Sequence, residues 1–173
     1  LSSIVIAGVG ALGNIVATQL AMMGVGTMYL IDRDIVEASN LSRQPLYLQK
    51  DIGLPKTKVA KQKLIEMNPA INIKDYHQQV SYILTSMEIS ASVVVDCLDN
   101  LESRLWLNKY CVKKNIPLVS GGVYGFIGQL QVVLPGKTPC LQCNPLMTPK
   151  TVKGDSCGKE KTPSIATTCY VIG

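Results

Sequence analysis

The sequence predicts an α/β fold, in which a Rossmann-like, mostly parallel sheet carries helices on both faces. Short apolar runs alternate along the chain with segments of helical periodicity. The early runs are apolar at consecutive positions, as expected for parallel strands that are buried on both sides. A glycine-rich turn, G-V-G-A-L-G, joins the first apolar run to the first helical segment. Together these observations indicate strands and helices that alternate in βαβ units.

The first half of the chain divides into strands, helices and one long irregular segment. From Arg33 to Pro55 there is no clear periodicity, and irregular stretches of that length are usually functional or disordered. The second helical segment ends at Asn68-Pro69, because proline disfavours a helical residue before it. The expected strands are 2–7, 27–32 and 71–80, and the expected helices are 12–23 and 57–67.

The second half continues the alternation and then changes character. The expected strands are 92–100, 116–122 and 125–135, of which the last alternates apolar and polar residues as an antiparallel strand would, and the expected helix is 101–115. A C-x-x-C and a crossover segment occupy 135–162, within a single domain of residues 1–173. Because the chain begins on a strand pattern without a methionine and stops inside an apolar pattern, we expect both ends to be truncated.

The composition restricts the class of protein. Hydrophobic residues make up 47% and charged residues 17%, which is typical of a globular chain. The net charge of +5 suits an anionic nucleotide or an acidic partner, but no basic run exceeds Lys113-Lys114, which argues against nucleic acid. No apolar stretch reaches the ~18–20 residues of a membrane span. Without a signal peptide, and with a C-x-x-C among six cysteines, we expect a cytoplasmic protein.

The glycine-rich turn predicts a nucleotide site. Gly8, Gly10 and Gly13 match G-x-G-x-x-G between a strand and a helix, where the helix N-terminus faces an anion. Asp32, at the end of the second strand, is placed to accept hydrogen bonds from ribose hydroxyls. The motif alone would also suit NAD, and the glycines could instead serve the fold only.

Two later motifs suit phosphate groups better than nicotinamide. In S-N-L-S-R-Q, residues 39–44, Asn40 and Arg43 are candidates to contact phosphate oxygens. Lys56 begins a helix, where a cation is unfavourable unless an anion accompanies it. Each motif has an ordinary alternative, a solvated loop and a solvated first turn respectively.

Acidic residues end the strands at the edge where such sheets bind ligands. These are Asp32, Asp34, Asp96 and Asp99. Asp99 suits a Mg²⁺ ion bound to a triphosphate, since magnesium prefers oxygen ligands and commonly bridges a carboxylate and phosphates. Alternatively, Asp99 caps the helix that begins near Leu101.

The order of these motifs resembles the ThiF/MoeB superfamily of adenylyltransferases, which includes the ubiquitin-activating enzymes. The resemblance covers nearly the whole chain, through GVGALG, DRD, SNLSRQ, GLPK, DCLDN, PLVSGG and CLQC. It implies ATP and Mg²⁺, with Arg43, Lys56 and Asp99 as catalytic residues. Where the family usually has glycine, this chain has Ala11. The nucleotide-binding residues it implies are Gly8, Gly10, Ala11, Gly13, Asp32, Asp34, Asn40, Arg43, Gln44, Lys56, Leu98, Asp99 and Asn100.

The cysteines carry two further expectations. Cys140 and Cys143 have the spacing of half a tetrahedral zinc site, and in the family a second pair follows nearer the C-terminus. The alternative is a redox or free thiol pair. Cys157 corresponds to the cysteine that forms a thioester or a persulfide in many members, although a surface or structural role is equally compatible. Cys97 and Cys111 are expected in the core.

The resemblance implies that the protein adenylates the C-terminal glycine of a ubiquitin-like or sulfur-carrier protein with a Gly-Gly tail, as a homodimer. We also expect Gly121-Gly122-Val123 to admit that tail. Three alternatives stay open: activation of a tRNA, peptide or small-molecule carboxylate; an NAD-dependent oxidoreductase; and a catalytically silent subunit.

Overall fold

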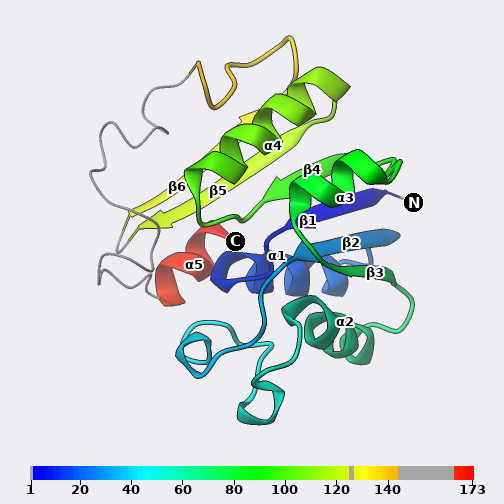
Figure 1. The fold of residues 1–173 in the computed structure, drawn as a ribbon, viewed down its shortest axis with the longest axis vertical. Coiled ribbons are helices and arrows are strands. Elements are labelled where there is room, and N and C mark those ends of the chain that lie inside the picture. The colour runs from blue at the N-terminus through cyan, green and yellow to red at the C-terminus, as the bar shows by residue number, and fades with distance from the viewer. Residues whose placement is uncertain (1, 125–126, 144–165) are drawn as a thin grey trace.

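The structure, a computed structural model, contains one six-stranded sheet and describes residues 2–124, 127–143 and 166–173. The strand order is β3-β2-β1-β4-β5-β6 (Figure 1). Every neighbouring pair is parallel except β5 and β6. The strands are β1 (Ser3–Ala7), β2 (Thr27–Asp32), β3 (Asn72–His77), β4 (Val93–Asp96), β5 (Leu118–Tyr124) and β6 (Ile127–Val133). The predicted Rossmann-like sheet is therefore confirmed, including its antiparallel last strand.

Helices cover both faces of the sheet, as predicted. One core cluster joins the sheet to α1 and α2, with α5 beside them, and the other joins the opposite face to α3 and α4 (Figure 1). The central strands supply fully buried side chains to these cores, among them Ile6, Leu30 and Val94. The helices are α1 (Ala11–Met22), α2 (Lys56–Met67), α3 (Val80–Ser86), α4 (Leu101–Lys114) and α5 (Ala166–Ile172).

Two elements differ from the sequence prediction, and one of them is the strand expected at 92–100, which ends as β4 at Asp96. The strand expected at 71–80 ends at His77, and Val80 instead begins the unpredicted helix α3. Val80, Ile83 and Leu84 are the buried residues of this seven-residue helix. Their helical spacing is too short a pattern to override the alternation that precedes it.

The segment between β2 and α2 is irregular, as predicted. It contains two short 3-10 helices, η1 (Ala38–Asn40) and η2 (Gln49–Asp51), and a bridge pairs Ile35 with Pro55. Leu46 and Tyr47 are buried, so the segment is packed against the domain. In the part of the chain that the structure describes, no helix combines the length and apolarity of a membrane span.

Candidate nucleotide site

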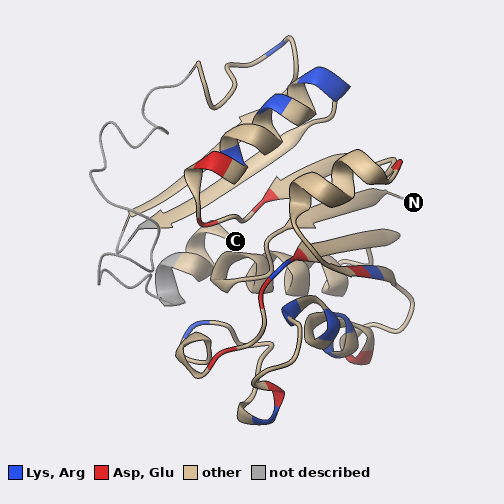
Figure 2. Ribbon diagram, viewed as in Figure 1, with Lys and Arg blue, Asp and Glu red and all other residues tan. Residues whose placement is uncertain are grey.

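The glycine-rich turn and the acidic residues of the predicted site lie at the carboxyl ends of the parallel strands. Ala7, the last residue of β1, pairs with Ile31 of β2 and with Asp96 of β4. The glycine-rich turn after β1 therefore lies between the ends of these two neighbours. Acidic residues stand where β2 and β4 end (Figure 2). This edge is where open α/β sheets bind their ligands.

The three glycines of the turn serve different needs. Gly8 has a positive φ of 91°, and a Cβ there would lie 2.8 Å from the carbonyl oxygen of Cys97. A Cβ on Gly13 would overlap the carbonyl oxygen of Gly8. At Gly10 the nearest atom to such a Cβ is Nε2 of Gln44, at 3.9 Å. Gly8 and Gly13 are thus required by the fold, whereas Gly10 leaves space above the start of α1.

The first turn of α1 has no side-chain cap. Its N–H groups and the positive end of the helix dipole therefore suit an anion.

These glycines should respond differently to alanine. We expect Gly13→Ala to destabilise the domain strongly, since backbone cannot move aside as a flexible side chain can. Gly10→Ala should retain the wild-type melting temperature within a few degrees and weaken ATP binding at least about tenfold, because its methyl group would occupy space for phosphate. Thermal denaturation and calorimetric titration with ATP test both variants. Equal melting temperatures for the two variants would contradict this division of roles.

Asp32 is built into the turn. Its Oδ2 accepts a hydrogen bond from the Val9 N–H at 2.7 Å, and its Oδ1 accepts one from the Asp34 N–H at 2.8 Å. Burial raises the pKa of the Asp32 carboxyl, and the nearby Lys56 charge together with these backbone hydrogen bonds opposes that rise. Each carboxylate oxygen has a further lone pair, so the geometry leaves room for ribose hydroxyls.

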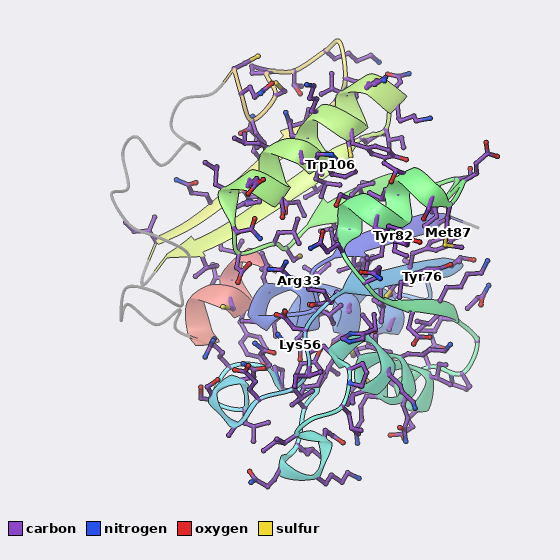
Figure 3. The ribbon with its side chains drawn as sticks, in the orientation of Figure 1. Arg33, Lys56, Tyr76, Tyr82, Met87 and Trp106 are labelled. Atoms are coloured by element: carbon purple, nitrogen blue, oxygen red, sulfur yellow. The ribbon has the colours of Figure 1, made fainter. Side chains whose placement is uncertain are left out.

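Lys56 is a buried cation beside this acid. It is the first residue of α2 and is 6% exposed. Its Nζ lies 3.0 Å from Oδ2 of Asp34, whose side chain is 53% exposed. Figure 3 shows Lys56 and Arg33 in the region between the end of β2 and the start of α2. Lys56 is therefore not in a solvated first turn: it is held at the candidate site by an acid that the solvent can reach.

Three residues of the S-N-L-S-R-Q segment differ in the hydrogen bonds that they make. Asn40 accepts from the Glu37 N–H at 3.1 Å and so holds its own loop. The Arg43 guanidinium donates to the Ser39 carbonyl oxygen at 2.9 Å. Gln44 is 3% exposed, and its Oε1 has no partner among the described residues. An unpaired buried amide oxygen is costly, which supports a ligand or water at this position.

The residues after β4 correct one sequence interpretation. The cap of α4 is Asn100, whose Oδ1 accepts from the Ser103 N–H at 2.9 Å, so Asp99 is not the cap. Among the residues that the structure describes, the exposed Asp99 carboxylate accepts a single long hydrogen bond, 3.4 Å, from the Asn100 amide. Leu98 lies beside the glycine turn, its backbone nitrogen 3.3 Å from a Cβ built on Gly8. A single free carboxylate fits Mg²⁺ that is otherwise bound by phosphates and water.

A buried ion pair holds the end of β4, and of the two roles that the sequence leaves open for Arg104, support of the site or a pair on the helix surface, it is the first that the structure favours. Asp96 is fully buried, and its Oδ2 accepts from Arg104 Nε at 3.0 Å and from Ser120 Oγ at 2.7 Å. Arg104 also donates to the carbonyl oxygen of Gly121 at 2.6 Å. The ion pair ties α4 to β4 and β5. The register of the strands would be needed to find it, because the sequence alone leaves Arg104 free to face the solvent.

The expectation that Gly121 and Gly122 admit a peptide tail is not supported by their surroundings. A Cβ on Gly121 would lie 2.6 Å from Cδ2 of Leu12, and one on Gly122 would lie 2.7 Å from Nη1 of Arg104. Neighbouring side chains thus occupy the space on both faces of the strand. These glycines allow β5 to pack against the glycine turn and α4.

The two cysteines of the C-x-x-C lie together in a turn. The Cys143 N–H donates to the Cys140 carbonyl oxygen at 3.0 Å, and the two sulfur atoms are 3.4 Å apart. Among the residues that the structure describes, no group of three or more His, Cys, Asp or Glu could hold a metal. The pair has the spacing of two ligands of a tetrahedral zinc site, the arrangement that the sequence predicts. Cys157 and most of 135–162 lie outside the described residues.

The thiols should differ in reactivity. Burial, with a contribution from the Asp96 charge, raises the pKa of Cys111 to about 12, and burial also raises that of Cys97. For Cys140, burial would raise the pKa, but hydrogen bonds from Asn108 and from Cys143 outweigh it and the pKa is lowered. After zinc chelation, iodoacetamide at pH 8 should therefore modify Cys140 well before Cys97 or Cys111. Peptide mass spectrometry checks the order, and early labelling of Cys97 would contradict it.

The sheet, the open glycine turn and the buried lysine at one edge are the features of a nucleotide-binding α/β domain. Within that class, the chain belongs to the ThiF family, whose model matches residues 1–173. The predicted resemblance is confirmed.

Characterised relatives agree with this membership. The sulfur carrier protein ThiS adenylyltransferase of Escherichia coli (strain K12) is 40% identical over 144 residues, which are 82% of this chain and 57% of that protein. SUMO-activating enzyme subunit 2 of Dictyostelium discoideum is 31% identical over 170 residues, 97% of this chain and 25% of the relative. This chain thus spans little more than half of the first relative and a quarter of the second.

Solved structures give the same result for the fold. E. coli MccB solved with ATP has a TM-score of 0.84 and 31% identity, over 99% of this chain and 52% of that one. MccB with MccA-N7isoASN gives a TM-score of 0.86 at 29% identity, over 99% of this chain and 53% of that one.

Proposed function

We propose that this domain catalyses the ATP-dependent adenylation of a protein C-terminus, that of a ubiquitin-like or sulfur-carrier protein ending in Gly-Gly. The main observation in support of the proposal is that Lys56 is buried beside the carboxyl ends of the strands, where its ammonium group pairs with the half-exposed Asp34. A nicotinamide enzyme has no use for Arg43, Lys56 and Asp99 together, whereas a reaction that builds charge on a triphosphate does. The ThiS adenylyltransferase and the SUMO-activating subunit reported above support the same chemistry.

In the proposed reaction, a carboxylate oxygen of the carrier attacks the α-phosphorus of ATP. The bond from that phosphorus to the bridging oxygen breaks, and pyrophosphate leaves with the electron pair. Asp32 would bind the ribose, and the turn at Gly10 would place backbone N–H groups against phosphate. Lys56, Arg43 and Gln44 would bind the charged oxygens as the displacement proceeds.

The proposal includes two metal ions, Mg²⁺ and zinc, and the chain has residues that could bind each of them. Asp99 would hold Mg²⁺, which when bound neutralises charge on the leaving phosphates. Cys140 and Cys143 would supply two of the four ligands of a structural zinc ion. The covalent role of Cys157 stays a prediction, in which its thiolate attacks the acyl adenylate, forms a thioester and releases AMP.

The proposal also covers the cellular compartment of the protein and its oligomeric state. Cys97 and Cys111 are buried and form no disulfide, which is compatible with a reducing compartment, and we place the protein in the cytoplasm. The homodimer also stays a prediction, which sedimentation equilibrium of the full-length protein tests.

ATP–pyrophosphate exchange of the full-length protein tests the proposed function. We expect exchange with Mg²⁺ and a carrier ending in Gly-Gly, and none with the same carrier lacking those two residues. Asp99→Asn should lower the rate about 100-fold, whereas Glu102→Gln, at an exposed position on the following helix, should not. Exchange that needs a free small carboxylate or a tRNA instead would overturn the choice of substrate. NAD binding without ATP binding would overturn the reaction class.

A further inference from the structure

The peptide group between Val9 and Gly10 is held by two side chains through its carbonyl oxygen. The preceding peptide group, between Gly8 and Val9, is held separately, because its Val9 N–H donates to Asp32 at 2.7 Å. The Val9 carbonyl oxygen accepts from Asn14 Nδ2 at 2.9 Å and from the Tyr47 hydroxyl at 2.7 Å. Val9 and Asn14 are fully buried and Tyr47 is 3% exposed. Two charge-free donors on one carbonyl, deep in the structure, fix the plane of this peptide.

The same two side chains connect the glycine turn to the irregular segment. Asn14 Oδ1 accepts from the Leu46 N–H at 2.9 Å. The Tyr47 N–H donates to the Gln44 carbonyl at 3.1 Å, and its hydroxyl lies 3.4 Å from the Lys56 carbonyl. Asn14 and Tyr47 thus join the turn to the segment that carries Arg43 and Gln44 and to the start of α2.

The orientation of this peptide decides where the Gly10 N–H points. In a planar trans peptide the N–H is opposite the C=O. Because Asn14 and Tyr47 hold the Val9 carbonyl, the Gly10 N–H points away from them. Gly10 directly precedes the first turn of α1, which has no side-chain cap. A Cβ built on Gly10 would meet no atom closer than 3.9 Å.

We infer that Tyr47 and Asn14 are positioning residues, which orient the Gly10 N–H toward nucleotide phosphate by holding the Val9 carbonyl. This inference rests on the proposed function, because it takes the ligand to be ATP. Neither side chain needs to touch the nucleotide. Their effect is on the phosphate end of the ligand, whereas the ribose is bound through Asp32.

Tyr47→Phe tests the inference, because it keeps the ring and removes only the hydroxyl. Calorimetric titration of the full-length protein with ATP and, separately, with adenosine should show ATP bound about fivefold more weakly and adenosine bound as by the wild type. Asn14→Ala should show the same selective loss. Melting temperatures, measured alongside, check that both variants fold.

Tyr110→Phe is the matched control. Its hydroxyl donates to the backbone carbonyl of Leu84 at 2.9 Å, between α4 and α3, far from the turn in the chain. We expect it to leave both affinities unchanged. Equal loss of ATP and adenosine in Tyr47→Phe, or no loss of either, would overturn the positioning role while leaving adenylation intact. A wild-type protein that does not bind ATP would overturn both.

Discussion

Lys56→Met is expected to lower kcat/KM for carrier adenylation about 100-fold, or about 2.7 kcal/mol of transition-state stabilisation. Methionine fills the buried volume, so the loss is that of the charge. Lys56 also opposes the rise that burial causes in the pKa of Asp32. Its removal should raise that pKa further, and the acid limb of the pH profile for kcat/KM should move to higher pH. Steady-state kinetics between pH 5 and 8 measure both effects.

Lys58→Met is the control for this prediction. Lys58 lies within one turn of Lys56 on α2, carries the same charge and is exposed. It should leave kcat/KM within about twofold of the wild type, since exposed charges are well screened. Equal losses in the two variants would show that net positive charge on α2 matters and the buried position does not.

Arg104→Met is expected to lower the free energy of unfolding by about 3–5 kcal/mol. Asp96 has no exposure, and Arg104 is its only ion-pair partner among the described residues. Removing the guanidinium leaves a buried carboxylate with neutral donors from Ser120 and the Leu98 backbone. Urea denaturation followed by circular dichroism measures the change.

The control is a more exposed ion pair, between Lys61 and Asp75. Lys61 lies 2.7 Å from Asp75, with side-chain exposures of 37% and 27%. Lys61→Met should cost less than about 1 kcal/mol, because solvent screens exposed pairs. If Arg104→Met cost no more than Lys61→Met, the Asp96 pair would not be what joins α4 to the sheet.

Strand and helix positions could be predicted where the pattern of apolar residues was unambiguous. The sequence predicted the buried strands β1, β2 and β4 and the twelve-residue helix α2. Consecutive apolar residues and helical spacing are direct indications of burial. Helix α3 was not, because its seven residues follow a strand that alternates up to His77. Short elements depend on what they pack against, and the sequence does not show that.

In the candidate site, too, some residues could be predicted from the sequence and others could not. Residues with a motif, such as Gly10, Asp32 and Lys56, could be named in advance. Residues that act on backbone atoms of distant elements could not: Tyr47 reaches the Val9 carbonyl across 38 positions, and Arg104 reaches the Gly121 carbonyl across 17. Likewise, only the structure shows that Asn100, and not its neighbour Asp99, caps α4.

Isotope transfer tests the central claim, attack of a carrier carboxylate on ATP, most directly. The full-length protein is incubated with ATP, Mg²⁺ and a Gly-Gly carrier labelled with ¹⁸O in its C-terminal carboxylate, and hydroxylamine is added to cleave the acyl adenylate. Because the carboxylate oxygen stays on phosphorus when the acyl group departs, the AMP should contain one ¹⁸O atom by mass spectrometry. Unlabelled AMP, or ADP with phosphate, would mean that the carboxylate does not attack the α-phosphorus and would contradict the account.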